Sequence, residues 1–153
     1  MKTAFAILLL VAPLALADHR YVTADDKLDF SALKTFSFVS GKATTTRPEL
    51  NNNLVYKKIQ DAIRTQLLAK GMTEAQNGSD VVIGLTVGQD KPNGPSVLFD
   101  NGVLTISMTR QDSNALIWQG VFTDEDVTPA KFAEKLPSHA MKLFSQYPPK
   151  KKK

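Results

Sequence analysis

The sequence predicts an α+β fold in which two main helices pack on one face of a mostly antiparallel sheet of about four to five strands. Three observations lead to this two-layer sandwich. Two alternating apolar runs flank a polar break at Gln111–Asn114, which is typical of an antiparallel hairpin with one buried face. Between Leu54 and Lys70, apolar residues recur at the spacing of one face of an α-helix. A second stripe of this kind runs from Phe132 to Tyr147.

The elements before the hairpin are a strand, a helix and a strand. Lys34–Val39 alternates phenylalanine with polar residues, which predicts a half-buried strand. Tyr21–Thr23 is a short run with β-strand propensity. Asn51–Asn53 can cap the helix, because an asparagine side chain accepts a hydrogen bond from a free terminal amide. Gly71 ends this helix, and Val81–Val87 forms the next strand. The proline- and glycine-containing stretch Gln89–Ser96 is predicted to be a loop.

The hairpin strands are predicted at Gly102–Arg110 and Ala115–Thr123, and we expect their apolar face to lie beneath the Val55–Leu67 helix. Trp118, the single tryptophan, is the expected core anchor. The residues predicted to form the core alternate or recur with the period of their elements; they are Phe36, Phe38, Ile59, Ile63, Leu67, Ile83, Leu85, Leu104, Ile106, Trp118, Phe122 and Leu143.

The last helix begins after a cap at Thr128, with Pro129 at its first position. An amide N–H has no partner within the helix at this position, so the missing N–H of proline costs nothing there. Pro137 lies within the helix and should kink it or split it in two. The preceding Asp124–Asp126 is predicted to be an exposed acidic loop.

Residues 1–17 have the pattern of a secretory signal peptide. Lys2 precedes an apolar run, Ala4–Leu16, and Ala15-Leu16-Ala17 is a cleavage site of small residues. A membrane span needs about 20 apolar residues, so this run is too short to be one. Cleavage after Ala17 leaves a single α+β domain over residues 18–147 and a disordered basic tail over residues 148–153. We therefore expect a periplasmic or secreted protein with no transmembrane segment after cleavage.

The charge and the cysteine count exclude several classes of function. The net charge of +4 includes Lys2 and the C-terminal Lys150, Lys151, Lys152 and Lys153, so the folded body is close to neutral. Nucleic-acid binding, which uses a basic folded face, is therefore not expected. The chain has no cysteine, so thiol catalysis, thiolate metal sites and a lipid anchor on cysteine are excluded.

No catalytic, cofactor-binding or metal-binding set is predicted. The only histidines are His19 and His139, and no serine lies in the sequence context of an activated nucleophile. His139 is expected at the surface or boundary of the last helix. Asp124–Asp126 lacks the spacing and the glycine of a calcium loop. No cofactor is therefore expected.

Six segments in this order resemble the bacterial envelope family known as domain of unknown function 4136. They are Asp29–Ser31, Lys34–Phe36, Ala69–Gly71, Gly102–Ile106, Leu116–Gly120 and Pro148-Pro149. The resemblance covers essentially the whole chain after the signal peptide and implies the fold. It carries no catalytic residues, and the lipid anchor that many members have is not expected here because cysteine is absent.

Three hypotheses for the function follow. The first is a non-catalytic envelope module that binds or assembles with an envelope protein through a sheet face or a helix face. A local function is expected in the Gln89–Asn101 loop or on the sheet face with Thr105, Ser107 and Thr109. The second is a small periplasmic hydrolase. The third is weak adhesion to an anionic lipid or polymer through Lys150–Lys153, since basic residues near an anionic bilayer are attracted to it.

Overall fold

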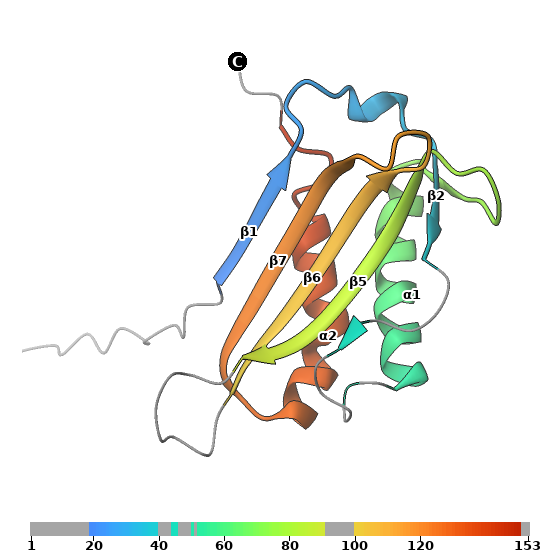
Figure 1. Ribbon diagram of the computed structural model, residues 1–153. Coiled ribbons are helices and arrows are strands. Elements are labelled where there is room, and N and C mark those ends of the chain that lie inside the picture. Colours follow the sequence, from blue (N-terminus) through green and yellow to red (C-terminus); the bar gives the residue numbers. More distant parts are fainter. Residues whose placement is uncertain (1–18, 40–43, 46–49, 51, 91–99, 151–153) are drawn as a thin grey trace, which may run out of the picture.

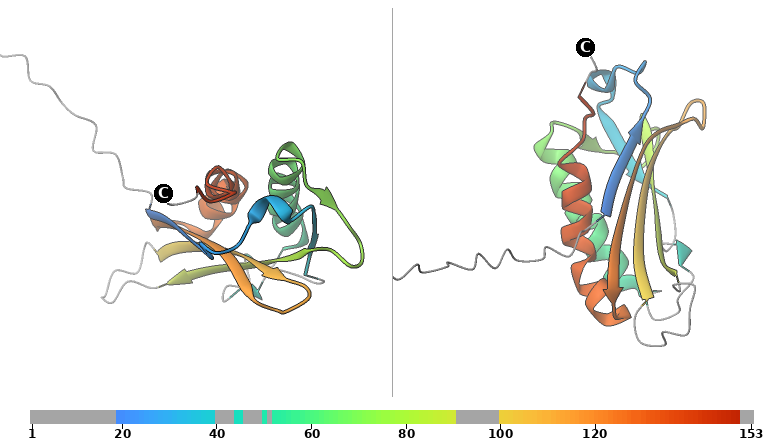
Figure 2. Two further views of the ribbon diagram at one scale, coloured as in Figure 1. Left: turned by 90° about the horizontal axis from the view of Figure 1, so that it is seen from above. Right: turned by 90° about the vertical axis from the view of Figure 1, so that its left-hand side faces the viewer.

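The computed structural model describes residues 19–39, 44–45, 50, 52–90 and 100–150. Its elements in chain order are β1 (His19–Ala24), the 3₁₀ helix η1 (Phe30–Ala32), β2 (Thr35–Phe38), β3 (Thr44–Thr45), α1 (Asn53–Ala69), β4 (Thr73–Glu74), β5 (Val81–Asp90), β6 (Asp100–Arg110), β7 (Leu116–Val127) and α2 (Pro129–Phe144). They form one sheet with both helices side by side on the same face (Figures 1 and 2). The α+β class is confirmed.

The sheet is mixed and, over the described residues, has seven strands, in the order β1-β7-β6-β5-β2-β4, with the short β3 also paired to β5. β1, β7, β6 and β5 are joined by antiparallel pairing, whereas β2 runs parallel to both β5 and β4. The prediction of four to five mostly antiparallel strands therefore differs in detail. The parallel part arises because α1 is the crossover of a βαβ unit between β2 and β5, and such a connection returns the chain in the same direction.

The predicted hairpin is confirmed as β6 and β7, and both strands are longer than predicted. Met108 lies opposite Trp118 and Leu104 opposite Phe122, so the alternating apolar side chains share one face. The turn contains Asn114 with φ of 53°, a left-handed conformation that asparagine tolerates better than most residues. Gln89 and Asp90, predicted to be in a loop, instead belong to β5.

Both helices begin at the predicted caps. The Asn52 side chain accepts a hydrogen bond from the amide of Leu54, and Thr128 Oγ1 accepts one from the amide of Lys131. Pro137 lies inside α2, which continues through it from Pro129 to Phe144. Within the described residues, no helix is long and apolar enough to cross a membrane.

The core lies between the sheet and the two helices. Every predicted core residue is buried except Phe38, which is half-buried. We predicted that α1 would cover the hairpin face, but α2 covers it instead. Trp118 stacks on Phe144 with ring centroids 4.9 Å apart, and Phe122 stacks on His139 at 3.8 Å. Sequence periodicity gives each helix an apolar face, but it carries no information on which helix meets which strand.

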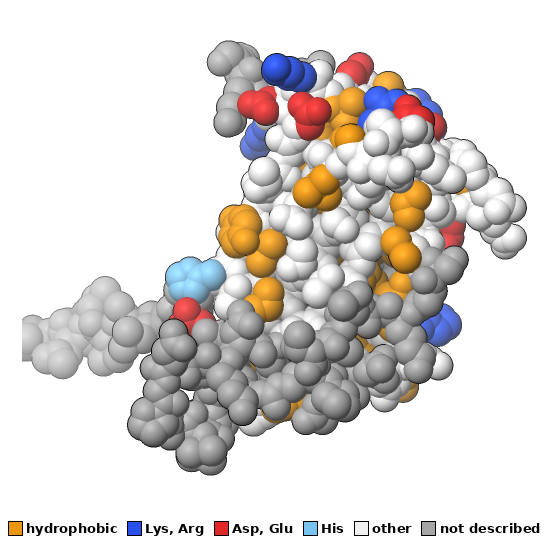
Figure 3. All heavy atoms as spheres, in the orientation of Figure 1, with side chains coloured by type: hydrophobic (Ala, Val, Ile, Leu, Met, Phe, Trp, Pro, Cys, Tyr) orange, Lys and Arg blue, Asp and Glu red, His pale blue; other side chains and the backbone are white. Residues whose placement is uncertain are grey.

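The opposite face of the sheet has no helix over its described part. Thr105, Ser107 and Thr109 lie half-buried on it. Figure 3 shows this face: its described part is mostly uncharged, with apolar side chains scattered over it, and most of the charged side chains drawn in colour lie near one end.

Candidate functional site

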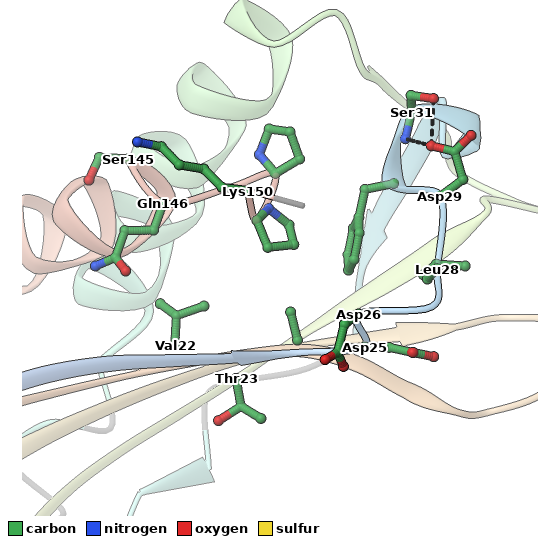
Figure 4. Close-up of a pocket in the computed structure, with 14 residues that line it drawn as sticks. Val22, Thr23, Asp25, Asp26, Leu28, Asp29, Ser31, Ser145, Gln146 and Lys150 are labelled. Carbon is green, nitrogen blue, oxygen red and sulfur yellow. Dashed lines mark hydrogen bonds between the residues drawn. The ribbon is translucent and has the colours of Figure 1, made fainter. Parts of the chain in front are cut away.

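A cleft of about 950 Å³ lies at one end of the domain, between two segments that are far apart in the sequence. One wall comes from the end of β1 and the connection to η1, and the other comes from the chain just after α2 (Figure 4). Its lining residues are Val22, Thr23, Ala24, Asp25, Asp26, Leu28, Asp29, Phe30, Ser31, Ser145, Gln146, Pro148, Pro149 and Lys150. The cleft therefore combines an apolar surface with three carboxylates.

The three carboxylates differ in their local roles. Asp25 Oδ1 accepts a hydrogen bond from the amide of Lys27 at 3.0 Å and so closes the turn after β1. Asp29 caps η1, because its Oδ1 accepts from the amide of Ser31 at 3.1 Å and from the hydroxyl at 2.7 Å. Among the described residues, Asp26 forms no hydrogen bond or ion pair, so its charge is available to a ligand.

Tyr147 fixes the C-terminal wall of the cleft to the core. Its ring meets the rings of Phe30 and Trp118 edge-on at 5.8 and 6.0 Å, and its hydroxyl donates to the sulfur of Met72 at 3.5 Å. Burial raises the pKa of Tyr147 to about 12, because the phenolate would lose its hydration. The neutral ring thus joins the segment after α2 to the N-terminal wall.

A second polar group lies inside the protein, under α2. Asp124 Oδ2 is 3.0 Å from Lys135 Nζ and 3.2 Å from His139 Nε2. The prediction of an exposed loop at Asp124–Asp126 was wrong, because all three residues belong to β7 and Asp124 is only 6% exposed. The prediction of a surface or boundary position was wrong for His139, which is 2% exposed. Both polar side chains are buried because each partly compensates the desolvation of the other.

An Asp–His pair can orient an imidazole for proton transfer. Here the His139 side chain is only 3% exposed and lies against the ring of Phe122, so a substrate would reach it only after α2 moved. The contacts instead join α2 to β7. We therefore treat this group as a structural contact and the cleft as the candidate site.

The remaining predicted site residues are spread over the molecule. Lys150 lines the cleft, and Lys151–Lys153 lie outside the described residues, so adhesion through the tail stays a prediction. Most of the predicted Gln89–Asn101 site, residues 91–99, also lies outside them. His19 is exposed and 3.3 Å from Glu125. Within the described part of the chain, no three His, Cys, Asp or Glu side chains gather to hold a metal ion.

Sequence reasoning missed the cleft because its walls are more than a hundred residues apart. Two local signals pointed to its parts: the acidic turn at Asp25-Asp26 and the proline pair that follows Tyr147. Neither signal shows that the two segments meet.

The sequence profile of domain of unknown function 4136 matches residues 20–149, which include both walls of the cleft except Lys150. The chain belongs to this family. The resemblance found in the sequence is thereby confirmed, and it covers nearly all of the described residues. No curated protein matches the chain.

Solved structures share the fold at low sequence identity. A PDZ domain protein from Parabacteroides distasonis ATCC 8503 superposes with a TM-score of 0.68 and 18% identity over 88% of this chain, which spans 37% of that protein. A PelC dodecamer from Paraburkholderia phytofirmans gives a TM-score of 0.53 and 10% identity, covering 84% of this chain and 96% of PelC. A second PelC dodecamer gives 0.52 and 11% identity, with 84% and 95% covered. These similarities concern the fold alone.

Proposed function

We propose that the chain is an exported, non-catalytic module of the bacterial cell envelope that binds or assembles with a protein partner through the cleft. The cleft is the observation that carries this proposal. Ligand sites are usually concave and mostly apolar, with a few polar groups that converge on the ligand. Val22, Leu28 and Phe30 provide apolar contact area here, and Asp25 and Asp26 provide charge.

Three further observations support the proposal. The signal-peptide pattern of residues 1–17 favours export. The PelC structures are dodecamers, so a fold of this kind is used for assembly in that protein. A binding role also agrees with the enclosed position of His139, the only histidine near a carboxylate in the core.

Export is tested by expressing the full chain in a Gram-negative host and fractionating the cells. We expect the protein in the periplasmic or extracellular fraction, with Asp18 as its first residue by mass spectrometry. Uncleaved protein that stays in the cytoplasm would contradict the proposed location.

The role of the cleft is tested by placing a photo-crosslinking residue at Gln146, an exposed position in its lining, in living cells. The matched control is Lys58, an exposed position on α1 outside the cleft. We expect a discrete crosslinked protein from Gln146 and none from Lys58. Equal products from both positions, or none from either, would speak against a partner bound at the cleft.

A further inference from the structure

β1 ends the sheet, so one of its edges faces no other strand among the described residues (Figure 1). Its pairing with β7 shows which backbone groups lie on that edge. The amide of Asp25 donates to the carbonyl of Ile117 at 2.9 Å, in line with the register of the two strands. Bonded and non-bonded positions alternate along an antiparallel ladder. Arg20, Val22 and Ala24 therefore turn their N–H and C=O groups away from β7, toward the open edge.

Among the described residues, this edge carries few of the usual protections, and Arg20 is the one charged side chain on the inner face of β1. Natural sheets often block an open edge with proline, a bulge or a covering segment, because free amides and carbonyls bind another strand. β1 contains no proline, and its register with β7 is regular over its whole length. Val22 and Ala24 pack partly against the core, so the inner face of the strand is held in place. The edge is therefore ready to accept a strand.

The charges along β1 are self-complementary when the strand is reversed. Arg20 lies near one end and forms no ion pair among the described residues, while Asp25 and Asp26 follow the other end. Asp26 likewise forms no ion pair there. An identical strand in the antiparallel direction would bring the arginine of each copy to the aspartates of the other. Such reciprocal contacts are what a twofold symmetric interface requires.

We infer that two copies of this chain pair through the open edges of β1, in the antiparallel direction, and that each copy completes the cleft of the other with Arg20. With Val22 of both copies opposite each other, Arg20 of one copy faces Ala24 of the other. Side chains alternate along a strand, so Arg20 shares the inner face with Val22 and Ala24, which line the cleft. Its guanidinium thus lies beside the turn of the opposite copy that follows Ala24 and carries Asp25 and Asp26.

This inference rests on the proposed function, since it names a second copy as an occupant of the same cleft. The pairing joins two sheets into one and keeps the helices of both copies on one side. The bonds involved are main-chain hydrogen bonds plus two reciprocal groups of charges, a mode that extends sheets between chains.

The test is the self-association of the exported, processed protein, measured by sedimentation velocity over a wide concentration range. We expect a dimer. Val22→Pro removes an edge N–H in each copy without touching the bonds to β7, and it should weaken dimerisation by about tenfold or more. Its circular dichroism spectrum should match that of the unchanged protein. A wild-type chain that stays monomeric would overturn the inference.

Charge exchange tests the register without disturbing the backbone. Arg20→Asp should be monomeric at low salt, and so should a chain carrying Asp25→Arg and Asp26→Arg. Mixing these two variants should restore a dimer with one copy of each. A dimer that survives Val22→Pro and both charge variants would use another surface and would refute the pairing.

The crosslinking outcome at Gln146 separates this inference from the proposed function. A crosslinked partner of different mass at the cleft, together with a purified chain that is monomeric, would support the proposed function and refute the β1 pairing. A dimer in solution with no crosslinked product at the cleft in cells would support the β1 pairing and refute the proposed function.

Discussion

Gly102 is the position where a single methyl group should disturb the packing of α2 on the hairpin. A Cβ built on Gly102 would lie 2.4, 2.5 and 2.6 Å from three atoms of the Phe132 ring. Non-bonded carbons prefer about 3.5–4.0 Å, so the ring would have to move by about 1 Å or more. Phe132 is fully buried in the first turns of α2, and the ring cannot leave without opening the core.

We expect Gly102→Ala to lower the free energy of unfolding by about 1–3 kcal/mol, the usual cost of overpacking a well-filled core. The matched control is Gly84→Ala on the opposite face of the sheet. There the added Cβ would meet Ser107 Oγ at 2.8 Å and Val39 Cγ2 at 3.9 Å. A serine hydroxyl can rotate away, so the control should stay within about 0.5 kcal/mol of the unchanged protein.

The assay is equilibrium urea unfolding followed by the fluorescence of Trp118. A lower midpoint with an unchanged m-value would report a change in stability and not in the unfolded state. If both substitutions cost the same, or if Gly102→Ala costs less than about 0.5 kcal/mol, the contact between Gly102 and the Phe132 ring is looser than these distances indicate.

Three further outcomes test the core and the connections. Asp124→Ala leaves His139 without its buried acceptor and should cost about 3 kcal/mol in urea unfolding, whereas the exposed neighbour Glu125→Gln should cost under about 0.5 kcal/mol; equal costs would contradict the burial of Asp124. Asp80→Ala should cost about 1 kcal/mol, because the carboxylate accepts the amides of Lys34 and Thr35 at 2.8 and 2.9 Å. These hydrogen bonds lower the pKa of Asp80, so the stability that its carboxylate contributes should be present above about pH 4 and be lost as the pH falls through the pKa in the folded state. A stability difference between the unchanged protein and Asp80→Ala that does not vary with pH would contradict this. Burial raises the pKa of Tyr147 to about 12, so stability should be unaffected below about pH 10 and fall by about 2–3 kcal/mol toward pH 12, because the unfolded chain ionises first. Tyr147→Phe should reduce this alkaline loss, and an unchanged loss would place the phenol in water.

Local periodicity predicted most of the elements but not their arrangement. The hairpin, α1 and α2 follow from repeats of two or about 3.6 residues and from caps, and these act within a few residues of one another. The two-residue strands β3 and β4 have no such repeat. They exist because a parallel neighbour lies beside them, which depends on contacts across the βαβ unit.

The candidate site could be predicted only in fragments. The acidic turn and the proline pair are visible in the sequence, but the cleft exists because Tyr147 packs between Phe30 and Trp118. The charge pattern of β1 is also plain in the sequence, yet its meaning depends on β1 lying at the edge of the sheet.

The sequence by itself determined the α+β class, the hairpin, the two helices with their caps and the family. Local backbone preferences and apolar periodicity are enough for these features. Only the tertiary structure decided that α2 covers the hairpin, that Asp124 and His139 are buried together, and that the N-terminal and C-terminal segments of the domain meet to form one cleft. Each of these depends on contacts between segments distant in the chain, where the desolvation of a polar group is offset by a partner that no local pattern identifies.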